Sequence, residues 1–261
     1  MRLLIKIGGT LLDSQDRRDR LAGQIADLLT AGHKVAVVHG GGKQITEYLE
    51  ARGIESEFRE GLRVTTPETI DAVLKVLTGT VNGELVAALI RSGAGAVGLT
   101  GLDGWLVQAE QMNPALGAVG RVTGANSRLL DVLSSAGFLP VIACLAGDLE
   151  GRFWNVNADQ MAVACATAFN ADTLIFLTDV AGVLDSNFTL ISTLTARAAR
   201  SLIDSGIAKG GMQAKLNAAT LALDQGVARV LIAPGFELQI LSRLLAGETV
   251  GTTRHFRSRS G

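Results

Sequence analysis

The chain has 261 residues, 48% of them hydrophobic and 19% charged, and a formal net charge of -1. This composition supports a large hydrophobic core in one domain or two lobes, and the low net charge argues against nucleic acid or an anionic membrane as a partner. The N-terminus holds no apolar stretch long enough for a signal peptide or a membrane span. Cys144 and Cys165 stand in apolar surroundings, so we interpret them as reduced thiols of a cytoplasmic protein rather than as a disulfide.

Short apolar runs alternate with helix-length segments along the chain, which predicts an α/β fold with a mainly parallel sheet and helices on both faces. The stretch from Trp105 to Ala125 is interpreted as an antiparallel excursion, and no linker or repeat divides the chain. Buried strands are expected at Leu3–Ile7, Lys34–His39, Gly95–Leu99, Leu139–Leu145, Thr173–Thr178 and Ala228–Ile232. Helices are expected at Asp16–Ala31, Lys43–Arg52, Pro67–Ser92, Ser127–Ala136, Ala158–Phe169, Ala196–Ser205 and Met212–Gln225.

Four of the predicted strands end in glycine-containing loops. Ligands of open α/β sheets bind at the carboxyl ends of the strands, so we expect several of these loops to meet at one edge of the sheet. The loops are Gly8-Gly9-Thr10, His39-Gly40-Gly41-Gly42, Thr178-Asp179-Val180-Ala181-Gly182 and Pro234-Gly235.

Two lysines beside paired glycines carry the clearest chemical signal. Lys6 lies in the first apolar run and precedes Gly8-Gly9, and Lys215 follows Gly210-Gly211 at the start of a predicted helix. A lysine in an apolar strand is costly to bury without an anionic partner, and glycine backbone lets an anion approach N–H groups closely. This arrangement, made twice, predicts a phosphoryl group held between two positive charges.

The loop His39-Gly40-Gly41-Gly42 precedes a predicted helix, where free N–H groups and the helix dipole favour an anion. Gln44 follows Gly42-Lys43, so this is not a Walker-type phosphate loop. No G-x-G-x-x-G follows the first strand, which argues against a nicotinamide-dependent dehydrogenase.

For several polar residues the sequence allows either a structural or a ligand-binding interpretation. Asn157 and Asp159 either cap a helix or, with Asn155, face a ligand. Arg63 is either a solvated loop residue or a bidentate clamp for a carboxylate.

The three histidines show neither metal-ligand spacing nor a Ser-His-Asp set, and we interpret His39 as a structural hydrogen-bonding residue. The tail Arg254–Gly261 is expected to be a frayed basic end.

Six motifs occur in the order seen in the amino-acid kinase family, which the chain resembles from its first strand to about Gly251-Thr252. Six motifs in order are far more specific than any one of them. They are Leu4-Ile5-Lys6-Ile7-Gly8-Gly9, Val37-Val38-His39-Gly40-Gly41-Gly42, Gly61-Leu62-Arg63-Val64-Thr65, Asn155-Val156-Asn157-Ala158-Asp159-Gln160, Thr178-Asp179-Val180-Ala181-Gly182-Val183-Leu184 and Gly210-Gly211-Met212 through Lys215.

The resemblance implies a single domain of residues 1–261, folded as an α/β/α sandwich around a mainly parallel sheet. An N-terminal lobe of about residues 1–150 would bind an acylated amino acid, and a C-terminal lobe of about residues 151–261 would bind ATP with Mg²⁺. Lys6 and Lys215 would stabilise the transferring phosphoryl group, and Asp159 would orient both lysines. Gly41, Gly42, Arg63 and Asn155 would hold the acyl amino acid. The ATP site would comprise Gly8, Gly9, Asp179, Val180, Ala181, Gly182, Val183, Leu184, Ile207, Ala208, Lys209 and Gly211.

Within the family, the motifs are most similar to those of enzymes that transfer the γ-phosphoryl group of ATP to the side-chain carboxylate of N-acetyl-L-glutamate in arginine biosynthesis. Such a carboxylate, with a reference pKa of about 4.3, is ionised at neutral pH and needs no general base. The alternatives are a sister kinase acting on an N-succinyl amino acid or on carrier-linked aminoadipate, and a non-catalytic ligand-sensing module. The sensing module would be expected to lack Lys6, Lys215 or Asp159.

Some positions depart from the family pattern beside the expected site. Glu60 stands where asparagine is usual, Leu102 and Trp105 replace polar residues, and Lys209-Gly210 also varies. These changes concern the identity of the acyl group and substrate more than the type of reaction.

The resemblance also bears on assembly. Arginine-inhibited members of the family carry an extra N-terminal helix that links dimers into a hexamer. Here Met1 and Arg2 lead directly into the first strand, so we expect a homodimer without feedback inhibition by arginine. The helical segment after Pro67 is expected to take part in the dimer contact.

Overall fold

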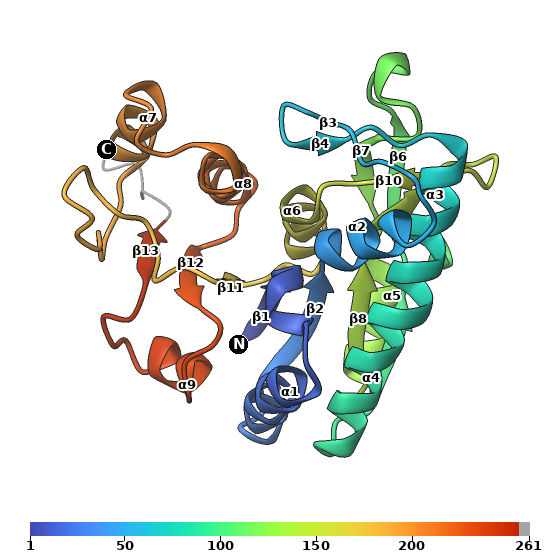
Figure 1. The fold of residues 1–261 in the computed structure, drawn as a ribbon. Coiled ribbons are helices and arrows are strands. Elements are labelled where there is room, and N and C mark those ends of the chain that lie inside the picture. The colour runs from blue at the N-terminus through green and yellow to red at the C-terminus, as the bar shows by residue number, and fades with distance from the viewer. Residues whose placement is uncertain (256–261) are drawn as a thin grey trace.

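The computed structural model describes residues 1–255. A seven-stranded sheet runs through the molecule in the order β13-β12-β11-β1-β2-β8-β5 (Figure 1). Neighbouring strands are parallel except for β12 and β13. The strands of this sheet are β1 (Arg2–Ile7), β2 (Lys34–His39), β5 (Ala96–Leu99), β8 (Leu139–Ala143), β11 (Thr173–Thr178), β12 (Arg229–Pro234) and β13 (Thr252–His255).

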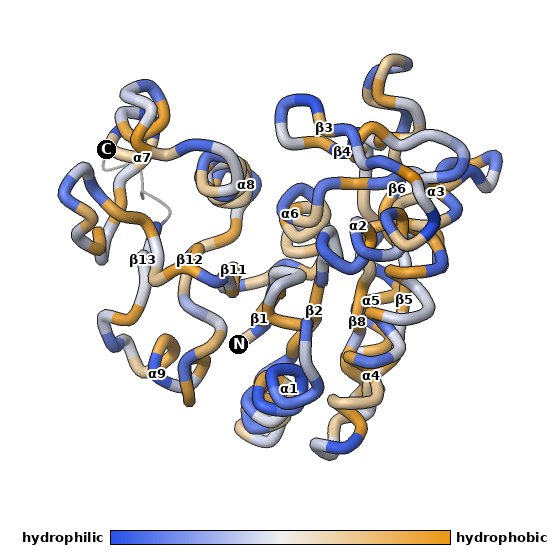
Figure 2. The backbone as a smooth tube through the Cα atoms, viewed as in Figure 1, coloured by the Kyte–Doolittle hydropathy of each residue, from blue (hydrophilic) through white to orange (hydrophobic). Residues whose placement is uncertain are grey.

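Helices cover the sheet in two layers. They are α1 (Gln15–Thr30), α2 (Gly42–Glu50), α3 (Pro67–Leu74), α4 (Asn82–Arg91), α5 (Ser127–Ser135), α6 (Ala158–Ala168), α7 (Ala196–Asp204), α8 (Gly210–Asp224) and α9 (Ile240–Leu245). α1 contacts α4 and α9 in one layer, and α6 contacts α5 and α8 in the other. Hydrophobic residues gather along the central strands, whereas α1 is largely hydrophilic (Figure 2). Strands β8 and β11 are buried throughout, as expected for parallel strands covered on both faces. The predicted α/β/α sandwich is therefore confirmed.

Two smaller sheets accompany the central one. The first has the order β10-β9-β6-β7, and its antiparallel pair β6–β7 confirms the excursion expected between Trp105 and Ala125. The second is a two-stranded hairpin of β3 and β4. These strands are β3 (Phe58–Arg59), β4 (Leu62–Arg63), β6 (Val107–Gln111), β7 (Gly120–Ala125), β9 (Leu145–Gly147) and β10 (Phe153–Asn155). Short 3₁₀ helices span η1 (Gly9–Leu12), η3 (Asp103–Trp105) and η4 (Pro114–Leu116).

A π-helical segment, η2 (Lys75–Val81), joins α3 to α4 in one helix of 25 residues, Pro67–Arg91. By length and composition alone this helix could cross a membrane, with a mean hydropathy of 1.5 in its most apolar window, 44% of which is buried. In the structure it packs against α1, α2 and β5 and contains the buried Asn82. A core helix of a soluble protein passes the same test, so the expectation that a membrane is not a partner stays a prediction.

Most expected elements begin and end within two residues of the observed ones. The single strand expected at Leu139–Leu145 is wrong, because the chain leaves the central sheet after Ala143 and enters the second sheet at Leu145. A continuous apolar run cannot reveal that crossing. Gly210-Gly211 form the first turn of α8 rather than a turn before it.

The C-terminal part of the chain differs most from expectation. α9 and β13 were not predicted, and the expectation of a frayed tail from Arg254 onward is wrong for Arg254 and His255, which belong to β13. The Arg254 side chain is buried and donates to the Leu216 carbonyl at 3.2 Å and the Thr220 hydroxyl at 2.8 Å. The rest of the expected tail, residues 256–261, lies outside the described residues.

Candidate active site

The four glycine-containing loops come together as expected. Strands β12, β11, β1 and β2 are consecutive in the sheet and parallel, so their carboxyl ends lie at the same edge. The turn after β1 and the loop after β2 touch, because a Cβ added at Gly9 would lie 3.2 Å from the Gly41 Cα atom. A side chain at position 9 would therefore press on the backbone of the neighbouring loop.

Two lysines converge on one carboxylate at this edge. Lys6 Nζ lies 2.8 Å from Asp159 Oδ1, and Lys215 Nζ donates to Asp159 Oδ2 at 3.4 Å. The Lys6 contact is an ion pair rather than an aligned hydrogen bond. Lys6 is 6% exposed and Asp159 is 5% exposed. The buried ammonium group of Lys6 and the half-buried one of Lys215 share one carboxylate, so the trio carries an excess positive charge that an anion would neutralise.

Local sequence explains why Asp159 is held here. Asn157 caps α6, with its side-chain oxygen accepting from the Asp159 and Gln160 N–H groups. Burial acts to raise the pKa of Asp159, but the charges of Lys6 and Lys215 outweigh it and hold that pKa below its usual value. Burial lowers the pKa of Lys215, and the like charge of Lys6 lowers it further. The carboxylate of Asp159 acts in the opposite direction but does not outweigh them. Asn157 therefore caps α6, and the same helix places the Asp159 carboxylate within reach of both lysines.

A cavity of about 170 Å³ opens beside this trio. Arg63 and Asn155 both line it, so the structure brings these two predicted residues together. The Arg63 guanidinium is buried and donates to the Gly42 carbonyl at 2.9 Å, the Thr46 hydroxyl at 2.7 Å and the Ser56 hydroxyl. Arg63 is therefore not a solvated loop residue. The remaining polar or glycine lining includes Gly40, Gly41, Gly42, Gly61 and Asn157.

Cys144 also lines this cavity, although no sequence motif indicated that position. Cys144 and Cys165 are both free and buried, as predicted. Burial raises the pKa of the Cys144 thiol to about 11 and that of Cys165 to about 12. Both thiols are therefore protonated at neutral pH, and neither is an activated nucleophile.

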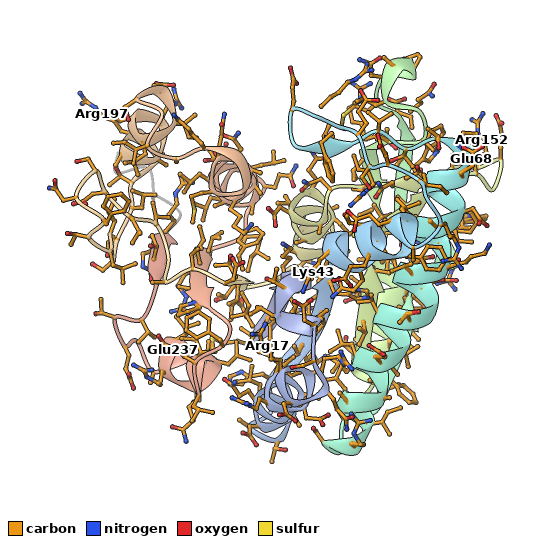
Figure 3. All side chains as sticks on the ribbon, viewed as in Figure 1. Arg17, Lys43, Glu68, Arg152, Arg197 and Glu237 are labelled. Atoms are coloured by element: carbon orange, nitrogen blue, oxygen red, sulfur yellow. The ribbon has the colours of Figure 1, made fainter. Side chains whose placement is uncertain are left out.

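Polar side chains link the segment after β1 to the segment after β2 through hydrogen bonds and an ion pair. These contacts were not predicted from the sequence. Gln44 Nε2 donates to the Gly9 carbonyl at 3.2 Å and to Asp13 Oδ1 at 2.8 Å. Lys43 Nζ lies 2.7 Å from Asp13 Oδ2, and the Arg17 guanidinium donates to the Thr10 carbonyl at 2.9 Å. Figure 3 shows Lys43 and Arg17 near the starts of α2 and α1, whereas Arg152 and Arg197 lie at the outside of the molecule. The sequence signal that could have indicated Gln44 is its position in the first turn of a helix, two residues after the three glycines.

Most of the residues expected around ATP lie between the end of β11 and the first turn of α8, whereas Gly8 and Gly9 follow β1. Gly182 and Val183 are buried against Thr252, whose hydroxyl accepts from the Val183 N–H at 2.9 Å. Val180 and Ile207 are apolar yet 41% and 43% exposed. Also exposed are Asp179, Ala181, Lys209 and Gly211, whereas Ala208 is buried and Leu184 is half-buried. Among the described residues there is no group of three His, Cys, Asp or Glu able to hold a metal ion.

Known proteins are similar to this chain in sequence and in fold. The model of the amino acid kinase family matches residues 1–234. A protein named acetylglutamate kinase from Solibacter usitatus is 64% identical over 252 residues, covering 97% of this chain and 98% of that protein. One of the same name from Acidobacterium capsulatum is 42% identical, with coverage of 97% and 98%. The crystal structure of smu.665 from Streptococcus mutans UA159 matches with a TM-score of 0.86 at 30% identity, covering 98% of this chain and 99% of that one. The chain therefore belongs to the amino acid kinase family.

Proposed function

We propose that this chain transfers the γ-phosphoryl group of ATP to the side-chain carboxylate of N-acetyl-L-glutamate, giving an acyl phosphate in arginine biosynthesis. The observation that carries the proposal is the cluster of Lys6, Asp159 and Lys215, at the sheet edge where two glycine loops touch and beside a cavity lined by Arg63 and Asn155. The activity in the names of the two relatives agrees with it.

The proposed chemistry accounts for the residue types in the site. Phosphoryl transfer depends on positioning and charge neutralisation more than on covalent help from the protein. The acceptor carboxylate is already ionised at neutral pH, so Asp159 organises the two lysines and does not abstract a proton. Lys6 and Lys215 neutralise charge that develops on the transferring group, and glycine N–H groups can approach it closely.

The acceptor would occupy the cavity beside Arg63. The Arg63 guanidinium, anchored by Thr46, Ser56 and the Gly42 carbonyl, would pair with a carboxylate of the acyl amino acid. The Asn155 amide, which donates to the Thr65 hydroxyl at 3.1 Å, would contact the acyl amide group.

The donor would be MgATP, bound on the other side of the lysines. Val180 and Ile207 are exposed apolar side chains suited to the adenine ring, and the N-terminus of α8 with Lys209, Gly210 and Gly211 suits the phosphates. Nucleotide phosphates and water commonly supply most ligands of Mg²⁺, which agrees with the lack of a metal-binding cluster in residues 1–255. On this view the N-terminal lobe of about residues 1–150, with Asn155 beyond it, serves the acceptor, and the C-terminal lobe of about residues 151–261 serves ATP.

We also propose a cytoplasmic homodimer. The two buried free thiols agree with a reducing compartment. The long helix Pro67–Arg91 exposes one large hydrophobic side chain, Ile90, which is 56% exposed, together with charged residues such as Asp71 and Glu84. We propose that this helix takes part in the contact with a second copy of the chain, with Ile90 in the contact.

An ATP-dependent hydroxamate assay tests the acceptor directly. Purified protein would be offered N-acetyl-L-glutamate, N-succinyl-L-glutamate, L-glutamate and L-2-aminoadipate with MgATP. We expect the highest kcat/KM with N-acetyl-L-glutamate. Preference for the succinyl compound would indicate the sister kinase, and no turnover with any acceptor despite nucleotide binding would indicate a ligand-sensing module.

A further inference from the structure

His39 lies directly behind the glycine-rich loop and has no role in the chemistry described so far. It is the last residue of β2 and is fully buried. Its Nδ1 atom lies 2.9 Å from the Gly40 carbonyl oxygen, and its Nε2 atom lies 2.9 Å from Asn82 Nδ2. Asn82, also buried, begins α4 just after the π-helical segment. One imidazole therefore links the long helix to the loop that lines the acceptor cavity.

The hydrogen-bond partners fix which ring nitrogen carries the proton. Asn82 Nδ2 also donates to the Val141 carbonyl at 3.0 Å, and a carbonyl can only accept, so this atom of Asn82 is the amide nitrogen. His39 Nε2 faces that donor and must accept from it. Burial lowers the pKa of His39 to about 4, although the bond to Gly40 acts in the opposite direction, so the ring is neutral and has one hydrogen. That hydrogen is on Nδ1 and is donated to the Gly40 carbonyl.

The Gly40 carbonyl belongs to the same peptide group as the Gly41 N–H. This peptide is trans, and in a planar trans peptide the C=O and N–H point in opposite directions. Holding the carbonyl toward the buried imidazole turns the Gly41 N–H away from that ring, in the loop that lies against Gly9 and lines the cavity. Within residues 1–255 this N–H has no hydrogen-bond partner. Glycine has little conformational preference of its own, so the bond from His39 limits rotation of this peptide.

The same long helix also leaves little room for any side chain at position 41. A Cβ added at Gly41 would lie 2.5 Å from Leu77 Cδ2 and 3.3 Å from Val81 Cγ2, both in the π-helical segment. Segments of π-helix recur at functional sites. Here the segment packs on the glycine loop, and the next residue, Asn82, directs the histidine behind it.

We propose that His39 and Asn82 are positioning residues that hold the Gly40–Gly41 peptide so that the Gly41 N–H donates to the phosphoryl group during transfer. The inference rests on the proposed kinase activity and extends it to residues that do not touch substrate. Loss of one preorganised donor of this kind commonly lowers turnover by about 10²- to 10³-fold.

A matched pair of substitutions tests the role. In His39→Asn the amide nitrogen takes the place of Nδ1 and can still donate to the Gly40 carbonyl, whereas in His39→Gln the amide reaches the place of Nε2 and loses that bond. We expect kcat to fall about 10²-fold in His39→Gln and less than about 10-fold in His39→Asn, with smaller changes in KM. His33→Gln is the control, because His33 lies just before β2, at the end of the strand opposite His39, and this variant should leave kcat unchanged.

A spectroscopic readout separates positioning from mere packing. Ring ¹⁵N shifts of His39 should show hydrogen on Nδ1 in the wild type. Asn82→Asp places an acceptor against Nε2 and should move the hydrogen there or add a second one, with a fall in kcat. Thermal unfolding verifies that each variant is folded.

The outcomes are distinct. Hydrogen on Nε2 in the wild type, equal kcat in the two His39 variants, or an effect confined to KM overturns the positioning role while leaving the proposed kinase activity intact. A folded wild-type protein with no turnover on any acceptor overturns the proposed function and the positioning role with it.

Discussion

Replacing Asp159 with asparagine tests the central electrostatic argument. Asp159→Asn keeps the size of the side chain but removes the one carboxylate that both lysines share. Removing one partner of a buried ion pair typically costs about 3–5 kcal/mol, because an uncompensated charge stays buried. Lys6 is as buried as Asp159, and the Lys215 side chain is only 14% exposed. We therefore expect the free energy of unfolding to fall by about 3–5 kcal/mol at neutral pH.

Urea unfolding of the protein without nucleotide provides the measurement. Asp71→Asn is the matched control, because the Asp71–Lys75 pair at 2.6 Å is more than half exposed on both sides. Such surface pairs contribute about 0–1 kcal/mol. The folded-state pKa of Asp159 is lowered, so its stabilisation is present above its unfolded value of 3.8 and is lost as pH falls through the folded value. The difference between wild type and Asp159→Asn should therefore shrink in strong acid.

A second readout uses anion binding. With the carboxylate gone, the two lysines should attract a polyphosphate more strongly, so ATP should raise the unfolding temperature of Asp159→Asn more than that of the wild type. Turnover should nevertheless fall, because the lysines lose their orientation. A destabilisation no larger than that of Asp71→Asn, with equal ATP stabilisation in both proteins, would refute the idea of a buried positive excess.

Further expectations concern individual residues. Lys6→Ala and Lys215→Ala should each lower kcat about 10²-fold or more in steady-state assays, and near-normal turnover in either folded variant would contradict their role. Arg63→Lys should raise KM for the acceptor far more than KM for ATP, because lysine keeps the charge but not the fork held by Thr46 and Ser56; equal effects would place Arg63 elsewhere. Glu60→Asn should stabilise the protein in urea by about 0.5–1 kcal/mol, since Glu60 has a φ of 50°, a region that asparagine tolerates better; no gain would count against backbone strain there. Burial lowers the folded pKa of His39 from 6.5 to about 4. The stabilisation that comes from burying the neutral ring is therefore lost as pH falls from about 6.5 toward about 4. Between about pH 7 and pH 5 the free energy of unfolding should fall by about 2 kcal/mol for this reason. His39→Asn should lack that part of the pH dependence, and identical pH profiles would disprove the assignment.

Local pattern was enough to predict most of the central sheet. β2 and β11 begin and end where the apolar runs do, because a strand buried on both faces is apolar throughout. The antiparallel strand β13 alternates in burial and carries a buried arginine, Arg254. Nothing local distinguishes such a segment from a solvated basic tail, because the carbonyl that accepts from Arg254 belongs to a helix 38 residues earlier.

The site was predictable as a set of residues but not as a geometry. Residue types at loop ends indicated Lys6, Lys215 and the glycines, and the family resemblance supplied Asp159 and Arg63. The link from Gln44 to Gly9 and the link from Asn82 to His39 each join segments more than 30 residues apart. Such contacts depend on how the strands are ordered in the sheet, and a single sequence carries no local signal for them.

The position of β1 in the sheet has a consequence for biosynthesis. One of its neighbours, β2, begins at Lys34, but the other, β11, begins only at Thr173. At about 5–20 residues per second, a ribosome needs about 7–28 s to make the intervening chain. During that time the nascent chain presents one edge of β1 with its main-chain N–H and C=O groups unpaired beside very apolar side chains. Such an edge is a template for aggregation. Chaperones that bind nascent chains should therefore raise the yield of this protein. The gain should be larger than for a fold in which the first strand pairs only with strands made soon after it.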